Sequence, residues 1–88
     1  MPADLVGQTK VVAGNLRAAL DALRATGRNV VSVRIYVVGL TEARTAEAMP
    51  HLMPVFDGAR PSLTGIGVAA LAAPELQIEV EMVVRVPD

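Results

Sequence analysis

The segment 30–37 constrains the fold most strongly, because its side chains alternate in character. The alternating residues are Val31, Val33, Ile35 and Val37, which are apolar, with Ser32, Arg34 and Tyr36 between them. In an extended backbone, every second side chain projects from the same face. The segment is therefore predicted to form a strand with one apolar face, and another element must cover that face.

The preceding segment, 4–26, has the spacing of an amphipathic helix. Apolar residues recur at helical intervals with alanines between them, at Leu5, Val12, Leu16, Leu20 and Leu23. Gly27 follows, where a left-handed residue commonly caps the C-terminal end of a helix. We therefore expect a helix that runs to about Thr26, is capped by Gly27 and packs on the apolar face of the strand.

A second helix is predicted to begin after Thr41, whose side chain suits the N-cap position, with Glu42 in the first turn. Pro50 and Pro54 must kink, restart or end this helix before a turn at 57–58, because proline donates no backbone hydrogen bond. The C-terminal half of this helix is expected to be irregular.

Two further strands are predicted in the rest of the chain. The first covers about 63–70 and contains glycines, and the second covers 76–86 after a turn at Ala73 and Pro74. The element order is helix, strand, helix, strand, strand. This order predicts an α+β fold in which two helices pack on one face of a small sheet.

The opposite face of this sheet is expected to be uncovered. It should carry the glycines of the 63–70 strand and polar side chains, namely Ser32, Arg34, Tyr36, Gln77, Glu79 and Glu81. Val83, with Val68 or Ile66, adds apolar surface that indicates burial against another subunit. A cross-strand ion pair is the favoured role for Arg34.

Length and composition limit the classes of function. Just over half of the 88 residues are apolar, which suffices for one small domain, 1–88, that oligomerisation would help to stabilise. Eight basic and nine acidic residues, with 2% aromatics, offer neither a phosphate-binding stripe nor a stacking platform for nucleic acid. The start of the chain lacks the pattern of a signal peptide, and Arg34 interrupts the apolar run 30–40. We expect a soluble cytoplasmic protein without nucleic-acid or membrane partners.

Several kinds of chemistry are not expected. The chain has no cysteine, and His51, its one histidine, has no ligand set nearby, so no metal site is predicted. Glu79 and Glu81 share one strand face, whereas the two carboxyl groups of a general acid and base pair should flank a cleft. Catalysis by this pair of carboxylates is therefore not expected. Gly65 and Gly67 lack the strand-to-helix context of a dinucleotide loop, so no cofactor is predicted.

Residues 60–71 read R-P-S-L-T-G-I-G-V-A-A-L, and residues 78–81 read I-E-V-E. These segments resemble the R-P-A-R-T-x-V-x-V-x-x-L and I-E-I-E segments of the Rid family, also called YjgF-like proteins and often labelled endoribonuclease L-PSP. The family's first helix and V-V-x-V-x-V-Y-V strand are matched by Gln8, Asn15, Leu16, Leu20 and residues 30–37. The resemblance covers nearly the whole chain and implies the family's fold, which is chorismate-mutase-like. It begins after the family's N-terminal hairpin region, so we expect a short form: a minimal variant, a fragment or a chain with a misassigned start.

The resemblance also implies an assembly and a chemistry. Rid-family members are usually homotrimers with clefts between subunits, where the second arginine of the signature binds a substrate carboxylate and water hydrolyses an enamine or imine. Leu63 stands at that arginine's position in this chain and cannot bind a carboxylate. The resemblance therefore implies deaminase ancestry without ordinary imine deaminase activity. RNA cleavage has no independent support in the sequence.

Other cleft positions follow from the same resemblance. The family's cleft asparagine falls on Glu47 and its cleft glutamate on Glu79, while Arg34 and Arg60 are the arginines best placed to compensate for Leu63. For Arg60, a loop or subunit-contact role is favoured. The candidate substrate-binding residues are thus Arg34, Glu47, Arg60, Leu63 and Gly65, and the candidate catalytic residue is Glu79.

Two functional hypotheses remain open. In the first, the protein is an enzyme that catalyses a hydrolysis or a divergent biosynthetic step. Glu79 donates a proton or orients water, and Arg34 or Arg60 anchors the substrate. This enzyme hypothesis predicts that a cationic side chain points into the cleft. In the second, the protein is a small-molecule-binding or protein-interaction module. This binding hypothesis predicts a packed Leu63 and a neutralised Arg34.

Overall fold

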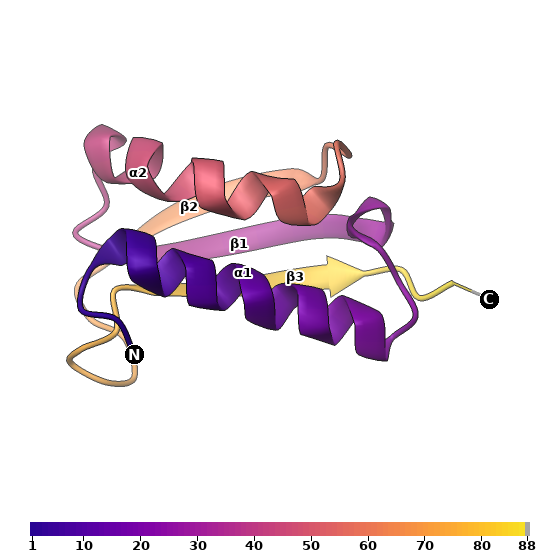
Figure 1. Ribbon diagram of the computed structural model, residues 1–88. Coiled ribbons are helices and arrows are strands. Elements are labelled where there is room, and N and C mark those ends of the chain that lie inside the picture. The colour runs from indigo at the N-terminus through magenta and orange to yellow at the C-terminus, as the bar shows by residue number, and fades with distance from the viewer. Residues whose placement is uncertain (88) are drawn as a thin grey trace.

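The computed structural model describes residues 1–87 and places two helices on one face of a three-stranded sheet (Figure 1). The elements are α1 (Leu5–Ala22), the 3₁₀ turn η1 (Gly27–Asn29), β1 (Val30–Val38), α2 (Glu42–Leu52), the 3₁₀ turn η2 (Met53–Phe56), β2 (Ser62–Val68) and β3 (Ile78–Val84). The predicted α+β class and the predicted order of helices and strands are confirmed.

The strand order in the sheet is β2-β1-β3, with β1 parallel to β2 and antiparallel to β3. The parallel pair requires a crossover, and α2 provides it. The register between β1 and β3 shifts between Val30 and Ser32. This irregularity leaves Val31 exposed, so its predicted place on the apolar face of the strand is wrong.

The core lies between the helices and the sheet. Its side chains come from both helices, η2, β1 and β3. The largest contributions are Val33, Ile35 and Val37 of β1, Leu5, Leu16 and Leu20 of α1, Leu52 of α2, Phe56 of η2 and Ile78 of β3. Figure 1 shows α1 lying over β3 and α2 lying over β2, with β1 between them. The alternation in β1 thus has the physical basis that the sequence indicated, because both helices bury the same face of this strand.

Gly27 does not cap the first helix. The helix ends at Ala22, and Arg24 adopts the left-handed conformation, with a φ of 55°. Gly27 instead begins η1 and is buried against η2, where an added Cβ would overlap the carbonyl oxygen of Val55 and lie 2.5 Å from the Cα atom of Phe56. The glycine is therefore required by a close approach of two backbone segments, which helix periodicity could not reveal.

The second helix begins as predicted. The Thr41 hydroxyl accepts a hydrogen bond from the Arg44 backbone N–H at 3.1 Å. Pro50 lies inside α2, and the helix ends at Leu52 and continues as a 3₁₀ turn that contains Pro54. The predicted turn follows, with positive φ angles at residues 57 and 58.

A buried glutamine on α1 connects the first residues of the chain to the segment just before β3. Gln8 is 1% exposed, and its side-chain amide donates to the carbonyl oxygens of Pro2 at 2.9 Å and Glu75 at 2.8 Å. Its Oε1 atom accepts from the Gln77 N–H at 2.8 Å. The amide group is satisfied on both sides, so α1 is tied to the segment that leads into β3.

Candidate functional site

Strand register divides the candidate site residues between the two faces of the sheet. Leu63 pairs with Val33 and Gly65 pairs with Ile35, so both lie on the face that the helices cover. Arg34 pairs with Thr64 on one side and Glu81 on the other, and projects from the open face. Paired residues in neighbouring strands share a face, so Arg34 and Leu63 lie on opposite sides of the sheet.

The helix-covered face contains a small apolar cavity between β2 and α2, which we call the α2 pocket. Its volume is about 180 Å³, and its lining consists of Ile35, Val37, Leu40, Thr45, Ala48, Met49, Leu63 and Gly65. The Thr45 hydroxyl donates to the Thr41 carbonyl oxygen at 3.0 Å, so the hydroxyl proton is already used. No charged residue in the described part of the chain lines this pocket.

The glycines of β2 belong to this helix-covered face, and the prediction that they lie on the open face is wrong. An added Cβ at Gly65 would lie 3.6 Å from Leu40 Cδ2, and one at Gly67 would lie 3.3 Å from Leu40 Cβ. The physical reason is the strand pairing, which sets Gly65 and Gly67 opposite the buried Ile35 and Val37.

The open face carries an ionic cluster. Arg34 Nη1 lies 3.5 Å from Glu81 Oε1, which is the predicted cross-strand ion pair, and the Tyr36 hydroxyl donates to the same oxygen at 2.7 Å. This hydrogen bond to Glu81 raises the pKa of the Tyr36 hydroxyl above its usual value. Because Arg34 and Glu81 are both more than half exposed, the pair adds little stability, and its single contact involves only Nη1 of the guanidinium.

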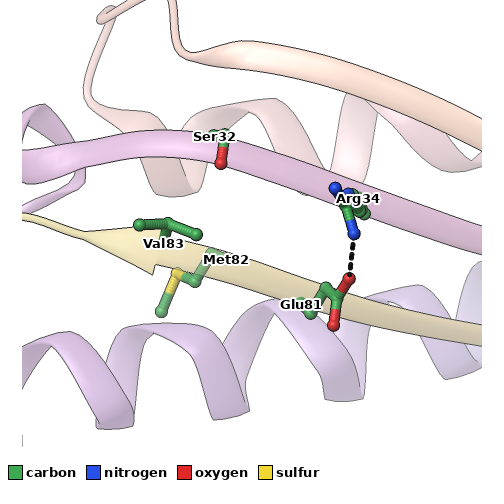
Figure 2. Close-up of a pocket in the computed structure, with 5 residues that line it drawn as sticks. All are labelled: Ser32, Arg34, Glu81, Met82 and Val83. Atoms are coloured by element: carbon green, nitrogen blue, oxygen red, sulfur yellow. Dashed lines mark hydrogen bonds and ion pairs between the residues drawn. The ribbon is translucent and has the colours of Figure 1, made fainter.

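A second cavity, of about 270 Å³, adjoins this ion pair (Figure 2). Its lining residues are Ser32, Arg34, Glu81, Met82 and Val83. Figure 2 shows Arg34 and Glu81 pointing toward one another across β1 and β3. Met82, by contrast, packs against the core on the other side of the sheet.

The remaining candidates do not converge with Leu63 within one chain. Glu79 is exposed on the open face, opposite Tyr36. Glu47 is exposed on α2 because its neighbour Ala48 takes the buried position, and Arg60 is exposed before β2 begins. Arg34 and Glu79 therefore share the open face, as diagonal neighbours on β1 and β3, whereas Glu47 lies on α2 and Arg60 lies before β2.

Sequence reasoning did not identify the α2 side of the pocket. Thr45, Ala48 and Met49 come from one face of α2, and Leu40 comes from the connection between β1 and α2. Their spacing of three and four residues was a usable signal, since such residues lie on one side of a helix. That spacing does not indicate which strand these residues face.

Neither a metal-binding group nor a membrane-spanning helix is found in residues 1–87. Within residues 1–87, no group of three or more histidine, aspartate or glutamate side chains is arranged to hold a metal ion. The described helices include none that is both long and apolar enough to cross a membrane.

The fold and the pocket define an α+β protein with two helices on one face of a mixed sheet and an apolar cavity beside the edge strand. The Endoribonuclease L-PSP family model matches residues 1–86. The chain therefore belongs to this family, the Rid or YjgF-like family that the sequence resembles.

Solved structures agree with this assignment. YyfB from Yersinia pestis, a Rid-family protein of unknown function, is 40% identical with a TM-score of 0.84, over 93% of this chain and 62% of that protein. Rv2704 from Mycobacterium tuberculosis, a member of the YjgF/YER057c/UK114 family, is 32% identical with a TM-score of 0.80, over 93% of this chain and 68% of that protein. The chain thus spans less than two thirds of the Yersinia protein. No curated protein matches it significantly.

Proposed function

We propose that this chain is a single Rid-type domain that forms a homotrimer with a ligand cleft at each subunit boundary. We propose further that it does not perform arginine-anchored hydrolysis of imines or enamines, and that it acts by binding a ligand. The observation that carries this proposal is the surroundings of Leu63, which lines an apolar pocket at the position where the family signature has arginine.

The chemistry of carboxylate anchoring supports this proposal. A guanidinium group holds a planar carboxylate through two parallel hydrogen bonds, and a leucine side chain has no donor to offer. Arg34 is a poor substitute, because it is paired with Glu81 and projects from the opposite face of the sheet. The binding hypothesis expects a packed Leu63 and a neutralised Arg34. Arg34 is paired with Glu81, whereas Leu63 lines the apolar pocket but is 40% exposed.

The activity test is hydrolysis of 2-aminoacrylate, generated in solution by a dehydratase and followed as ammonia release. The unmodified protein is expected to match the no-protein control, because nothing at residue 63 fixes the substrate carboxylate. Leu63→Arg tests whether the rest of the cleft still supports the chemistry, and Leu63→Ala is its matched control without a cation. Acceleration by the unmodified protein would contradict the proposal and make Arg34→Ala and Arg60→Ala the next variants.

The open face of the sheet supports assembly. Val83, near the end of the edge strand β3, is 59% exposed, and Ile66 and Val68 of β2, the other edge strand, share this face. Apolar side chains on an uncovered sheet face gain stability when another subunit buries them, even where polar residues lie between them, as they do here.

The assembly prediction concerns mass in solution. Light scattering is expected to give three times the 9.2 kDa mass of one chain, and Val83→Glu is expected to give single chains because it buries an unpaired carboxylate at the interface. Val86→Glu is the matched control, since Val86 is also exposed, at 54%, but lies beyond the end of β3. A single-chain mass for the unmodified protein would contradict the homotrimer.

A further inference from the structure

We infer that the α2 pocket is a binding site for a small, uncharged, apolar molecule of about the size of one six-membered ring. This inference rests on the proposed function and deepens it, because it gives a ligand class to the cleft wall that Leu63 forms. Three observations carry it: the volume of the pocket, the chemistry of its lining and the presence of a glycine that the backbone does not need.

The volume fits a ring. The α2 pocket measures about 180 Å³. An enclosed cavity of roughly 150 Å³ lined by leucine, isoleucine and phenylalanine in another protein binds benzene, so a volume of this order holds one ring. The α2 pocket is open, because Thr45, Leu63 and Gly65 are exposed. Leu63 is 40% exposed, so the α2 pocket has a route to the surface beside this side chain.

The lining selects against charge. Seven of the eight lining residues have no polar side-chain atom, and the eighth, Thr45, donates its hydroxyl proton to the backbone of Thr41. A carboxylate or ammonium group in this pocket would lose part of its water and gain no partner of opposite charge. An uncharged apolar molecule would lose little and would bury carbon surface against Leu40, Met49 and Leu63.

Gly65 keeps the pocket open. A glycine in a strand weakens the strand, and one reason to retain it is the close approach of a ligand or of another backbone segment. At Gly65 an added Cβ would make only ordinary contact, 3.6 Å from Leu40 Cδ2, and Gly65 has no positive φ angle, in contrast to Gly39 and Gly58. Gly67 differs, since its added Cβ would be tight against Leu40 at 3.3 Å. Close packing against Leu40 thus explains why residue 67 is a glycine. At residue 65 no close contact requires a glycine, and the space beside it is available to a ligand.

The test compares two probes of nearly equal shape, toluene and benzoate, by ligand-observed NMR on the unmodified protein. Toluene is expected to bind and benzoate to bind at least about tenfold more weakly, because only the methyl group suits the lining. In Gly65→Val, toluene affinity is expected to fall by about tenfold or more, because the added methyl groups fill the cavity. Gly14→Ala is the matched control, since Gly14 lies on the exposed side of α1 with nothing within 4 Å of an added Cβ.

Two outcomes would overturn the inference. One is no preference for toluene over benzoate, including the absence of binding by either. The other is undiminished toluene binding by a Gly65→Val protein whose circular dichroism matches that of the unmodified chain. The ammonia-release assay separates the two proposals. Ammonia release by the unmodified protein contradicts the proposed function, whereas no toluene binding by an unmodified protein that also releases no ammonia contradicts only the ligand class.

Discussion

Phe56→Ala is expected to lower the free energy of unfolding by about 3–5 kcal/mol, the cost of deleting a fully buried phenylalanine side chain. Phe56 is 0% exposed and contacts the core from η2, directly after α2. Its backbone also lies against Gly27, so the site has little freedom to collapse around the lost ring. A small domain has only about 5–15 kcal/mol of stability in total, so the variant should be close to unfolding.

The measurement is urea denaturation followed by far-ultraviolet circular dichroism, at one protein concentration for all variants because assembly shifts the apparent stability. Met53→Ala is the matched control, since Met53 belongs to the same 3₁₀ turn and is 37% exposed. It is expected to cost less than about 1 kcal/mol. Equal losses for the two variants would show that burial at residue 56 does not stabilise this end of the fold.

Gln8→Leu is expected to lower the free energy of unfolding by about 2–4 kcal/mol, mainly through lost hydrogen bonds. Leucine is close to glutamine in size, so the change leaves no large cavity. It does leave the Gln77 N–H without its acceptor and the Glu75 and Pro2 carbonyl oxygens without their donor. A polar group that loses its partner costs roughly 1–3 kcal/mol when it stays buried. These three bonds are part-buried, and Pro2 and Glu75 are exposed, so water offsets part of that cost.

Hydrogen exchange gives this prediction a local readout. The amide of Gln77 is expected to exchange faster in Gln8→Leu, because its acceptor is the substituted side chain. Asn15→Leu is the matched control, since Asn15 lies exposed on the same helix and should change stability by less than about 0.5 kcal/mol. An unchanged Gln77 exchange rate, with equal stability of the two variants, would contradict a structural role for Gln8.

Local sequence signals gave the elements and their order. The helical spacing of Leu5, Leu16 and Leu20 and the alternation of β1 each depend on neighbours within a few residues, so both patterns were readable without a structure. The Thr41 cap is equally local, because its partner lies three residues away. These signals sufficed for the α+β class and for two helices on one face.

The structural roles of the glycines were the hardest feature to predict from the sequence. Gly27 looked like a helix cap by position, yet it is set by the backbone of η2, about thirty residues further along the chain. Gly65 and Gly67 were predicted on the open face, and their pairing with β1 puts them on the helix-covered face. A glycine carries no side chain to mark its surroundings, so only contacts from distant segments reveal what it makes room for.

The sequence by itself determined the order of the elements, the apolar face of β1 and the family. The tertiary structure alone decided that Leu63 and Arg34 lie on opposite faces, and that Leu63 and α2 enclose an apolar pocket. The physical reason is strand register: a shift of one residue between β1 and β2 would turn the side chains of β2 to the other face. That register is fixed by long-range packing and not by any local pattern.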